Sequence, residues 1–570
     1  MRRFFRPAVA FLLLVAVAAV LRLPGLTRHD VVDDEALMAL RSYGWIDTWI
    51  GSMQSPIDLF PTQQWWQDLS FHDHPPLTFF VEHWSFRLLG PTVLALRLPF
   101  ALAGLALVGV LYWLGTAMVD RRYGLLCAAL GAVANYPVWL SRVGFQEGLL
   151  LVWLALALLA FLRSLDDPRW CWLVGTAVGL ALLTKYSAVV ILPVIVGGYA
   201  VLAPQRFRQA PAWGGAGLAA LLLSPVIAYN TMYYLTRGHF DATLWAMLGQ
   251  RHQDFWSDDH AYTGINDLLR WWHWLPDGFG WLLTLVAIGG AVLMAIHWRG
   301  GRLPGNGPRL GWTVCVLAVS TVVLLSLAPG RKQYAALMTL PVALCAAYLL
   351  RELTRQRSGA GVAFIVLLLV ALPTANGQLL AAPFGTPGAA YQVLRPTSYA
   401  YRALDEYLER LFNGQPPAQM ITAGDVQLAE RLRSRHRADL GRTPATTGRP
   451  PLVIYDDRMD FAAVRWTMLL RDLYRYQPTM VTESLVKVFE SEGGEYLENI
   501  GFNDFRIILA EPLLLGENDG APNSYGWRMR KIFEREGILP GTILTDAFGR
   551  PAFAVFQLTT LRSLVTENEE

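Results

Sequence analysis

Residues 92–118 read TVLALRLPFALAGLALVGVLYWLGTAM and contain one charged side chain, Arg97. A hydrocarbon core about 30 Å thick is crossed by roughly 20 helical residues, because each residue adds about 1.5 Å. This run is therefore long and apolar enough to span a bilayer, and similar runs recur along the chain.

The composition agrees with a membrane protein: 54% of the 570 residues are hydrophobic and 16% are charged, which excludes an ordinary soluble domain. The net charge of +3 implies no nucleic-acid partner. We predict a polytopic α-helical protein with about eleven spans. Their apolar cores lie at 7–24, 92–118, 124–139, 145–162, 170–183, 186–203, 212–232, 279–297, 310–328, 333–350 and 360–381.

The basic residues between these runs predict the orientation of the chain. Alternate gaps carry Arg, and short cytoplasmic loops are enriched in basic residues. The residues concerned are Arg2, Arg3, Arg6, Arg121, Arg122, Arg163, Arg169, Arg206, Arg208, Arg299, Arg302, Arg309, Arg351, Arg355 and Arg357. We therefore expect a multi-pass protein of the cell membrane, in contact with lipid, whose loops 25–91 and 233–278 and whose C-terminal part are extracytoplasmic.

The chain changes character after about residue 382. Strand-like runs at 451–455 and 553–556 alternate with helix-like runs such as 462–474. We predict two domains: a transmembrane domain over 1–381 and an extracytoplasmic α/β domain over 382–570.

The first outer loop begins with an acidic cluster, His29-Asp30-Val31-Val32-Asp33-Asp34-Glu35. Adjacent carboxylates repel one another, and charge close to a membrane loses hydration, so the cluster is a candidate site. The alternative is a solvated helix start, in which Asp33 or Asp34 caps a helix over 35–41.

The same loop ends with Phe71-His72-Asp73-His74-Pro75-Pro76-Leu77. The two prolines fix the backbone, so Asp73 or His74 could be aimed into a site shared with Asp34. The alternative is a rigid turn at the membrane surface. We expect no cofactor and no metal, although a His-x-His flanked by carboxylates leaves a divalent cation open as an alternative.

Four cations lie on the side where basic residues are disfavoured. Arg142 and Lys185 lie in short outer turns, where they either bind an anionic group or reach the interface. Arg331 and Lys332, followed by Gln333 and Tyr334, form the strongest exception. A lipid phosphate is the natural partner for this pair, and contact with lipid headgroups is the alternative.

The order of these motifs resembles the GT-C class of glycosyltransferases, in particular the protein O-mannosyltransferases and the bacterial aminoarabinose transferases. The matching residues are Asp34-Glu35 and Asp73–Leu77, and the similarity continues through Leu96–Pro99, Ser141-Arg142, Arg331–Tyr334 and Pro341. It covers about residues 1–380. Asp33 and Glu147 depart from the family pattern.

The resemblance implies a GT-C fold and an inverting transfer of a sugar from a polyprenyl-phosphate donor to a protein, lipid or glycan acceptor. It implies that Asp34 is the general base. We expect Asp34, Glu35 and Asp73 to be catalytic. We expect the substrates to be bound by His74, Arg142, Lys185, Arg331, Lys332 and Tyr334.

Two other functions use the same charges. A transporter or flippase of lipid-linked sugars would normally carry ionisable residues near the bilayer midplane and repeated halves, and the sequence has neither pattern. An oligosaccharyltransferase-like enzyme would need a Trp-Trp-Asp motif, whereas Trp271-Trp272 precedes His273.

Overall fold

The computed structural model describes residues 7–31, 33–48, 56–60, 62–248, 270–327, 332–355, 400–418, 420, 449–512, 524–546 and 549–561. The chain forms two compact units. The helical unit comprises Met1–Leu26 and Trp45–Leu394, and the α/β unit comprises Thr27–Gly44 and Arg395–Glu570. The predicted boundary at 381 lies outside the described residues. The grouping of 27–44 with the C-terminal part is not predicted by the sequence.

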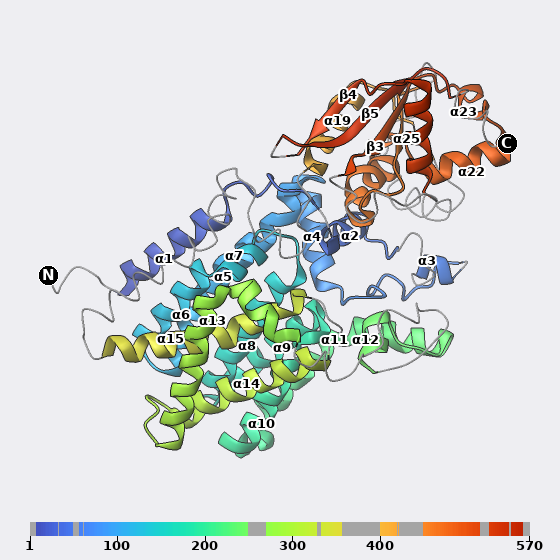
Figure 1. Ribbon diagram of the computed structural model, residues 1–570. Helices are drawn as coiled ribbons and strands as arrows, with labels where there is room; N and C mark the ends of the chain where they lie inside the picture. Colours follow the sequence, from blue (N-terminus) through green and yellow to red (C-terminus); the bar gives the residue numbers. More distant parts are fainter. Residues whose placement is uncertain are drawn as a thin grey trace. The chain divides into compact units, whose positions relative to one another are not determined.

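The helical unit follows the predicted apolar runs (Figure 1). Its elements are α1 (Pro7–Arg22), α3 (Pro56–Leu59), α4 (Leu77–Leu89), α5 (Val93–Met118), α6 (Arg121–Val133), α7 (Asn135–Leu140), α8 (Gln146–Ser164), η1 (Pro168–Trp170), α9 (Cys171–Thr184), η2 (Tyr186–Ile191), α10 (Leu192–Leu202), η3 (Pro204–Arg208), α11 (Ala210–Arg237), α12 (Ala242–Met247), α13 (Arg270–Arg299), α14 (Gly307–Leu327), η5 (Lys332–Met338) and α15 (Thr339–Arg355). The predicted run 360–381 lies outside the described residues.

Six helices among the described residues are long and apolar enough to cross a membrane. They are Val93–Met118, Gln146–Ser164, Ala210–Arg237, Gly278–Arg299, Gly307–Ser326 and Tyr334–Arg355. The shorter apolar helices Pro7–Arg22 and Tyr186–Leu202 coincide with two further predicted runs. The chain is therefore a multi-pass helical protein, and the number of eleven spans stays a prediction.

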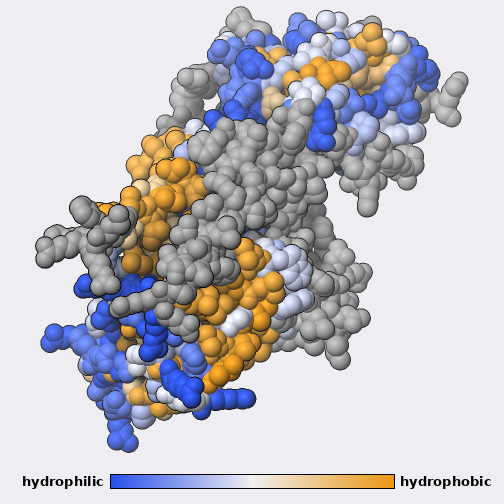
Figure 2. Space-filling view, turned by 60° about the vertical axis from the view of Figure 1, so that its left-hand side comes forward, coloured by the Kyte–Doolittle hydropathy of each residue, from blue (hydrophilic) through white to orange (hydrophobic). Residues whose placement is uncertain are grey.

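Small residues let some of these helices approach closely. A Cβ added to Gly175 on α9 would lie 1.8 Å from the carbonyl oxygen of Gly215 on α11, so the two backbones touch. Such contacts are typical of helix packing in membranes. The outer faces of the helices are apolar: Leu12, Leu221 and Leu285 are each more than half exposed. Figure 2 shows apolar residues covering much of the visible face of this unit.

The α/β unit is built on a five-stranded mixed sheet of order β2-β1-β3-β5-β4. Its strands are β1 (Leu452–Tyr455), β2 (Thr479–Val481), β3 (Phe505–Ala510), β4 (Thr542–Thr545) and β5 (Pro551–Leu558). β1 is parallel to β2 and β3, whereas β5 is antiparallel to β3 and β4. β1 and β5 coincide with the two predicted strands.

Helices cover both faces of this sheet. Phe556 of β5 contacts Phe533 of α25 (Tyr525–Glu536), whereas Phe553 contacts Tyr401 of α19 (Tyr401–Phe412). Residues three apart in a strand point to opposite faces, so α25 and α19 lie on opposite sides. This explains why five successive residues of β5 are buried.

The remaining helices of the unit are α2 (Asp33–Gly44), α21 (Phe461–Val464), η7 (Arg465–Leu469), η8 (Arg471–Arg475), α22 (Thr482–Glu492) and α23 (Tyr496–Asn499). η7 and η8 are π-helical. Together with α21 they occupy the run 462–474, which the sequence predicts to be helical. α2 packs on α21 and η7, and its last turn places the Tyr43 ring against that of Tyr474, 4.8 Å between centroids.

Candidate active site

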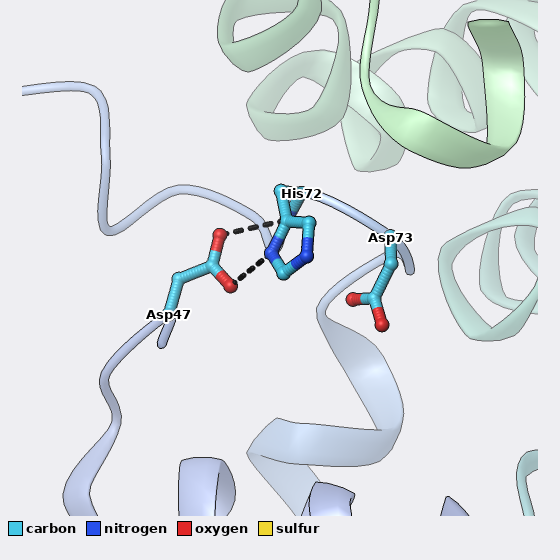
Figure 3. Close-up of side chains that lie close together, drawn as sticks. All are labelled: Asp47, His72 and Asp73. Atoms are coloured by element: carbon cyan, nitrogen blue, oxygen red, sulfur yellow. Dashed lines mark hydrogen bonds and ion pairs between the residues drawn. The ribbon is translucent and has the colours of Figure 1, made fainter. Parts of the chain in front are cut away.

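A buried aspartate fixes the second motif of the first outer loop. The Asp47 carboxylate accepts hydrogen bonds from the His72 backbone amide at 2.7 Å and from Nδ1 of its ring at 2.6 Å (Figure 3). The Tyr229 hydroxyl of α11 donates to the same carboxylate at 3.1 Å. We call Asp47, His72 and Tyr229 the Asp47 cluster; all three are buried. It ties the loop to a long helix of the unit.

The segment after α11 holds the same motif from another side. The backbone amide of Ala242 donates to the His72 carbonyl oxygen at 2.6 Å, and the Thr243 hydroxyl donates to the Asp73 carbonyl oxygen. The backbone at 72–73 is thus held both by Asp47 and by the start of α12. Its position is set by two segments that are far apart in the sequence.

Asp73 and His74, both predicted site residues, follow directly. The Asp73 carboxylate lies 3.0 Å from Nδ1 of His74, and both side chains are partly exposed, at 15% and 18%. In Figure 3 the Asp73 carboxylate lies on the side of the His72 ring that faces away from Asp47. Pro75 and Pro76 then lead into α4. The motif therefore combines a buried anchor with a more accessible carboxylate and imidazole.

A second buried carboxylate lies close to Asp73. Asp241 accepts hydrogen bonds from the Tyr186 hydroxyl at 2.5 Å, the Asn230 amide at 2.8 Å and the Leu244 backbone amide at 2.9 Å. Burial, together with the negative charge of Asp73, raises the pKa of Asp241 to about 6. We call Asp241, Tyr186 and Asn230 the Asp241 cluster.

Neither Asp47 nor Asp241 is predicted from the sequence. Asp47 lies in no recognisable motif. Asp241 could have been found as a helix cap, because it stands directly before α12 and accepts the amide of Leu244 three residues later.

Three side chains of this region also form a candidate metal site. Ligand atoms of Asp47, His72 and Asp73 lie within 4.8 Å of one another, and His74 is not in this group. However, Asp47 already accepts two hydrogen bonds from His72. A cation there would have the second ring nitrogen of His72 and the Asp73 carboxylate, fewer than the three or four protein ligands typical of zinc sites. A histidine paired with a carboxylate through one ring nitrogen can also bind a metal through the other, so the absence of a metal stays a prediction and a divalent cation stays its alternative.

The structure brings together two of the residues predicted to bind substrate, Lys185 and Tyr334. Nζ of Lys185 lies 4.8 Å from the centroid of the Tyr334 ring, and it donates to Oε1 of Glu147 at 2.5 Å. Lys185 and Glu147 are both buried. Tyr334 lies in η5, whose first residue is Lys332. Arg331 and the side chain of Lys332 lie outside the described residues.

Arg142 binds backbone in this structure. Its guanidinium donates to the carbonyl oxygens of Arg22 at 3.0 Å, Pro24 at 2.8 Å and Gly25 at 3.2 Å. These carbonyls follow the last turn of α1, where a helix leaves its acceptors without intrahelical partners. The geometry supports a helix-ending contact, and the substrate-binding role of Arg142 stays a prediction.

Asp34 and Glu35 lie in the first turn of α2, in the α/β unit. Asp34 is partly exposed and Glu35 is buried, at 1% exposure. A helix does start in this cluster, but it begins at Asp33, so that Asp34 lies inside it and a capping role stays a prediction. The Asp34 side chain keeps an accessible surface, which is compatible with a catalytic role. The side chain of Asp33 lies outside the described residues.

Comparison with known proteins bears on this arrangement. Residues 73–229 match the family model of dolichyl-phosphate-mannose-protein mannosyltransferases. The matched region includes Asp73, His74, Arg142 and Lys185. No curated protein sequence matches the chain.

Two solved structures have a similar fold. ArnT from Cupriavidus metallidurans in the apo state is 14% identical, with a TM-score of 0.50, over 96% of this chain and 97% of that one. Archaeal oligosaccharyltransferase AglB from Archaeoglobus fulgidus, in complex with an inhibitory peptide and a dolichol-phosphate, is 13% identical, with a TM-score of 0.50, over 88% of this chain and 69% of that one. The chain thus resembles the GT-C class of membrane glycosyltransferases, and within it the protein O-mannosyltransferases and ArnT.

Proposed function

We propose that the protein is an inverting glycosyltransferase, which moves a sugar from a polyprenyl-phosphate donor to an acceptor on the extracytoplasmic face of the membrane. The observation that carries this proposal is the match of residues 73–229 to a family of lipid-phosphate-sugar-dependent transferases, within a chain of GT-C fold. AglB, which shares the fold, was solved with a dolichol-phosphate. This supports a lipid-linked donor here.

Asp34 is the general base in this mechanism. The acceptor oxygen attacks the anomeric carbon from the side opposite the phosphate, its proton passes to the Asp34 carboxylate, and the carbon–oxygen bond to the phosphate breaks. The bonding electrons leave with the phosphate, and attack from the opposite side inverts the anomeric centre. Glu35 and Asp73 complete the catalytic set. A base near the acceptor is the main requirement, because phosphate is already a good leaving group.

Cations stabilise the departing phosphate. Arg331 and Lys332 take this role, because they are cations on the side of the membrane where basic residues are disfavoured. Charge-assisted hydrogen bonds to phosphate are stronger than hydrogen bonds between neutral groups. Arginine can bind a phosphate through two parallel hydrogen bonds. Replacing both residues with Gln is expected to weaken donor binding; unchanged donor affinity in the folded double variant would leave them as headgroup contacts.

The deciding experiment uses the purified protein in lipid vesicles with a panel of polyprenyl-phosphate sugars as donors and of proteins, lipids and glycans as acceptors. We expect one donor to be consumed, with release of free polyprenyl phosphate that requires Asp34. Movement of a donor across the bilayer without release of phosphate would favour the transporter alternative and contradict the transferase.

The extracytoplasmic location of the α/β unit is tested separately. Leu539 is 82% exposed, so a cysteine at this position can react freely. We expect Leu539→Cys to be labelled by a membrane-impermeant thiol reagent in intact cells, with the unsubstituted chain and its four cysteines as the background control. Labelling that requires lysis would reverse the proposed orientation.

A further inference from the structure

Asp30 joins the acidic segment to a helix that lies far away in the sequence. Its carboxylate accepts the backbone amide of Tyr401 at 3.1 Å through Oδ2 and that of Arg402 at 2.9 Å through Oδ1. Asp30 is 2% exposed and belongs to the same compact unit as α19. Both oxygens of one buried carboxylate are therefore used on the first two residues of a helix.

The first amides of a helix have no partners inside it and carry the positive end of the helix dipole. The residue directly before α19 is Ala400, which has no side-chain acceptor for them. Asp30 supplies the acceptor and the negative charge instead. α19 is thus capped by a residue of the first outer loop rather than by its own neighbour.

Further contacts hold the same segment at both ends. Before α2, the Arg402 guanidinium donates to the Arg28 carbonyl oxygen at 3.4 Å. At the last turn of α2, the Tyr43 and Tyr474 rings meet edge to face. Asp34 lies between these attachments, four residues after Asp30. The α2 segment is accordingly fixed to the sheet-bearing part of the unit on both sides of Asp34.

We propose that Asp30 is a positioning residue for the base Asp34, and that the α/β unit acts in catalysis by holding α2. The inference rests on the proposed transferase function. In this role Asp30 does not contact substrate. Asp30 acts through the placement of α2. Geometry of this kind matters because a shift of about 1 Å at a reacting group can cost roughly 10²-fold in rate.

The test compares Asp30→Ala and the milder Asp30→Asn with a matched control. Ser524 caps α25 in the same unit, where its hydroxyl accepts the Trp527 amide, and Ser524→Ala removes a cap without touching the 27–44 segment. We expect kcat of Asp30→Ala to fall at least about tenfold while KM for the lipid donor changes less than about twofold. The kcat of Asp30→Asn should fall less, because the asparagine side chain keeps one acceptor oxygen.

Hydrogen exchange supplies a readout that does not depend on activity. The amides of Tyr401 and Arg402 should exchange faster in Asp30→Ala than in the unsubstituted protein, and Ser524→Ala should leave them unchanged while keeping its kcat. A fall in kcat of similar size in Ser524→Ala would overturn the proposal, since it would reflect loss of stability in the unit as a whole.

Asp34→Asn separates this proposal from the one on which it rests. If Asp34→Asn is inactive and Asp30→Ala keeps full kcat, the positioning role is wrong and the base assignment stands. If Asp34→Asn retains turnover, the base assignment fails, and the role of Asp30 fails with it. Should Asp30→Ala not fold, the same comparison is made with Asp30→Asn.

Discussion

The first outer loop is divided between two units, and its two halves are anchored by different means. In 27–44, buried Asp30 accepts two backbone amides of a helix more than three hundred residues away in sequence. In 45–91, the buried Asp47 carboxylate accepts hydrogen bonds from a backbone amide, an imidazole nitrogen and a phenol hydroxyl. In each half the anchor is buried and one proposed catalytic carboxylate, Asp34 or Asp73, is partly exposed, whereas Glu35 of the proposed catalytic set is buried. Acidic residues in one loop thus have separable roles.

The largest effect should come from the first half of the loop. Asp34→Asn keeps the size and much of the hydrogen bonding of the side chain but cannot accept the proton. We expect turnover to fall by about 10²- to 10⁴-fold, equivalent to about 3–5 kcal/mol of barrier, while donor binding survives. Steady-state kinetics together with a donor-binding assay measure both quantities.

Asp33→Asn is the matched control, because it removes a neighbouring charge at the adjacent position. It should cost much less than Asp34→Asn. A larger loss at Asp33 would move the base by one residue. Near-normal turnover in both variants would leave the cluster as a helix start and remove the functional distinction between Asp34 and the anchoring aspartates.

An intermediate effect is expected in the second half. Asp47→Ala leaves the buried His72 amide and the Tyr229 hydroxyl without their acceptor, and a buried unsatisfied group costs about 1–3 kcal/mol. The melting temperature in detergent should fall accordingly. Asp68 is exposed and lies on the same loop, so Asp68→Asn should change stability by no more than about 0.5 kcal/mol. Equal shifts in the two variants would show that Asp47 is not an anchor.

The smallest effect concerns the charge of Asp73. The pKa of Asp241 is raised to about 6 from an ordinary value of 3.8, so the folded state holds its proton more tightly than the unfolded state does. The resulting stabilisation is complete below about pH 4 and is lost as pH rises through about 6. Asp73→Asn removes the negative charge that helps to raise the pKa of Asp241. The pH at which the stabilisation is lost should therefore be lower in this variant.

Infrared titration of the protonated carboxyl band measures that limit directly, with Asp241→Asn identifying the band. A band that titrates at the same pH in Asp73→Asn and in the unsubstituted protein would mean that the two carboxylates do not interact. The second half of the loop and the segment after α11 would then be joined by the hydrogen bonds at residues 72–73 and not by an interaction between the two carboxylates.

The spans and strands are predictable because their signals are local. Run 92–118 must cross lipid as a helix, and 451–455 carries the pattern of a buried strand, so both appear where expected. Lys185 and Tyr334 are both predicted to bind substrate, but their contact depends on how the helices pack. Asp47 carries no local signal, because its partners His72 and Tyr229 come from two other segments of the chain.

Arg142 illustrates the other limit of a sequence argument. The sequence predicts that Arg142 binds an anionic group or reaches the interface, and in the structure its guanidinium donates to the carbonyls of Arg22 and Pro24 at the end of α1. Backbone carbonyls at a helix end also attract cations. Residue type alone does not distinguish these acceptors from a phosphate.

The contact between Asp30 and Tyr401 also sets an order of events during synthesis. The two residues are 371 positions apart, and translation proceeds at about 5–20 residues per second, so roughly 20–75 s pass between them. Throughout that interval the helix that carries Asp34 has been made while its partner α19 has not. A chain that stops growing before residue 401 keeps Asp34 but never completes the attachment at Asp30, so the proposed positioning of the base could be reached only late in translation.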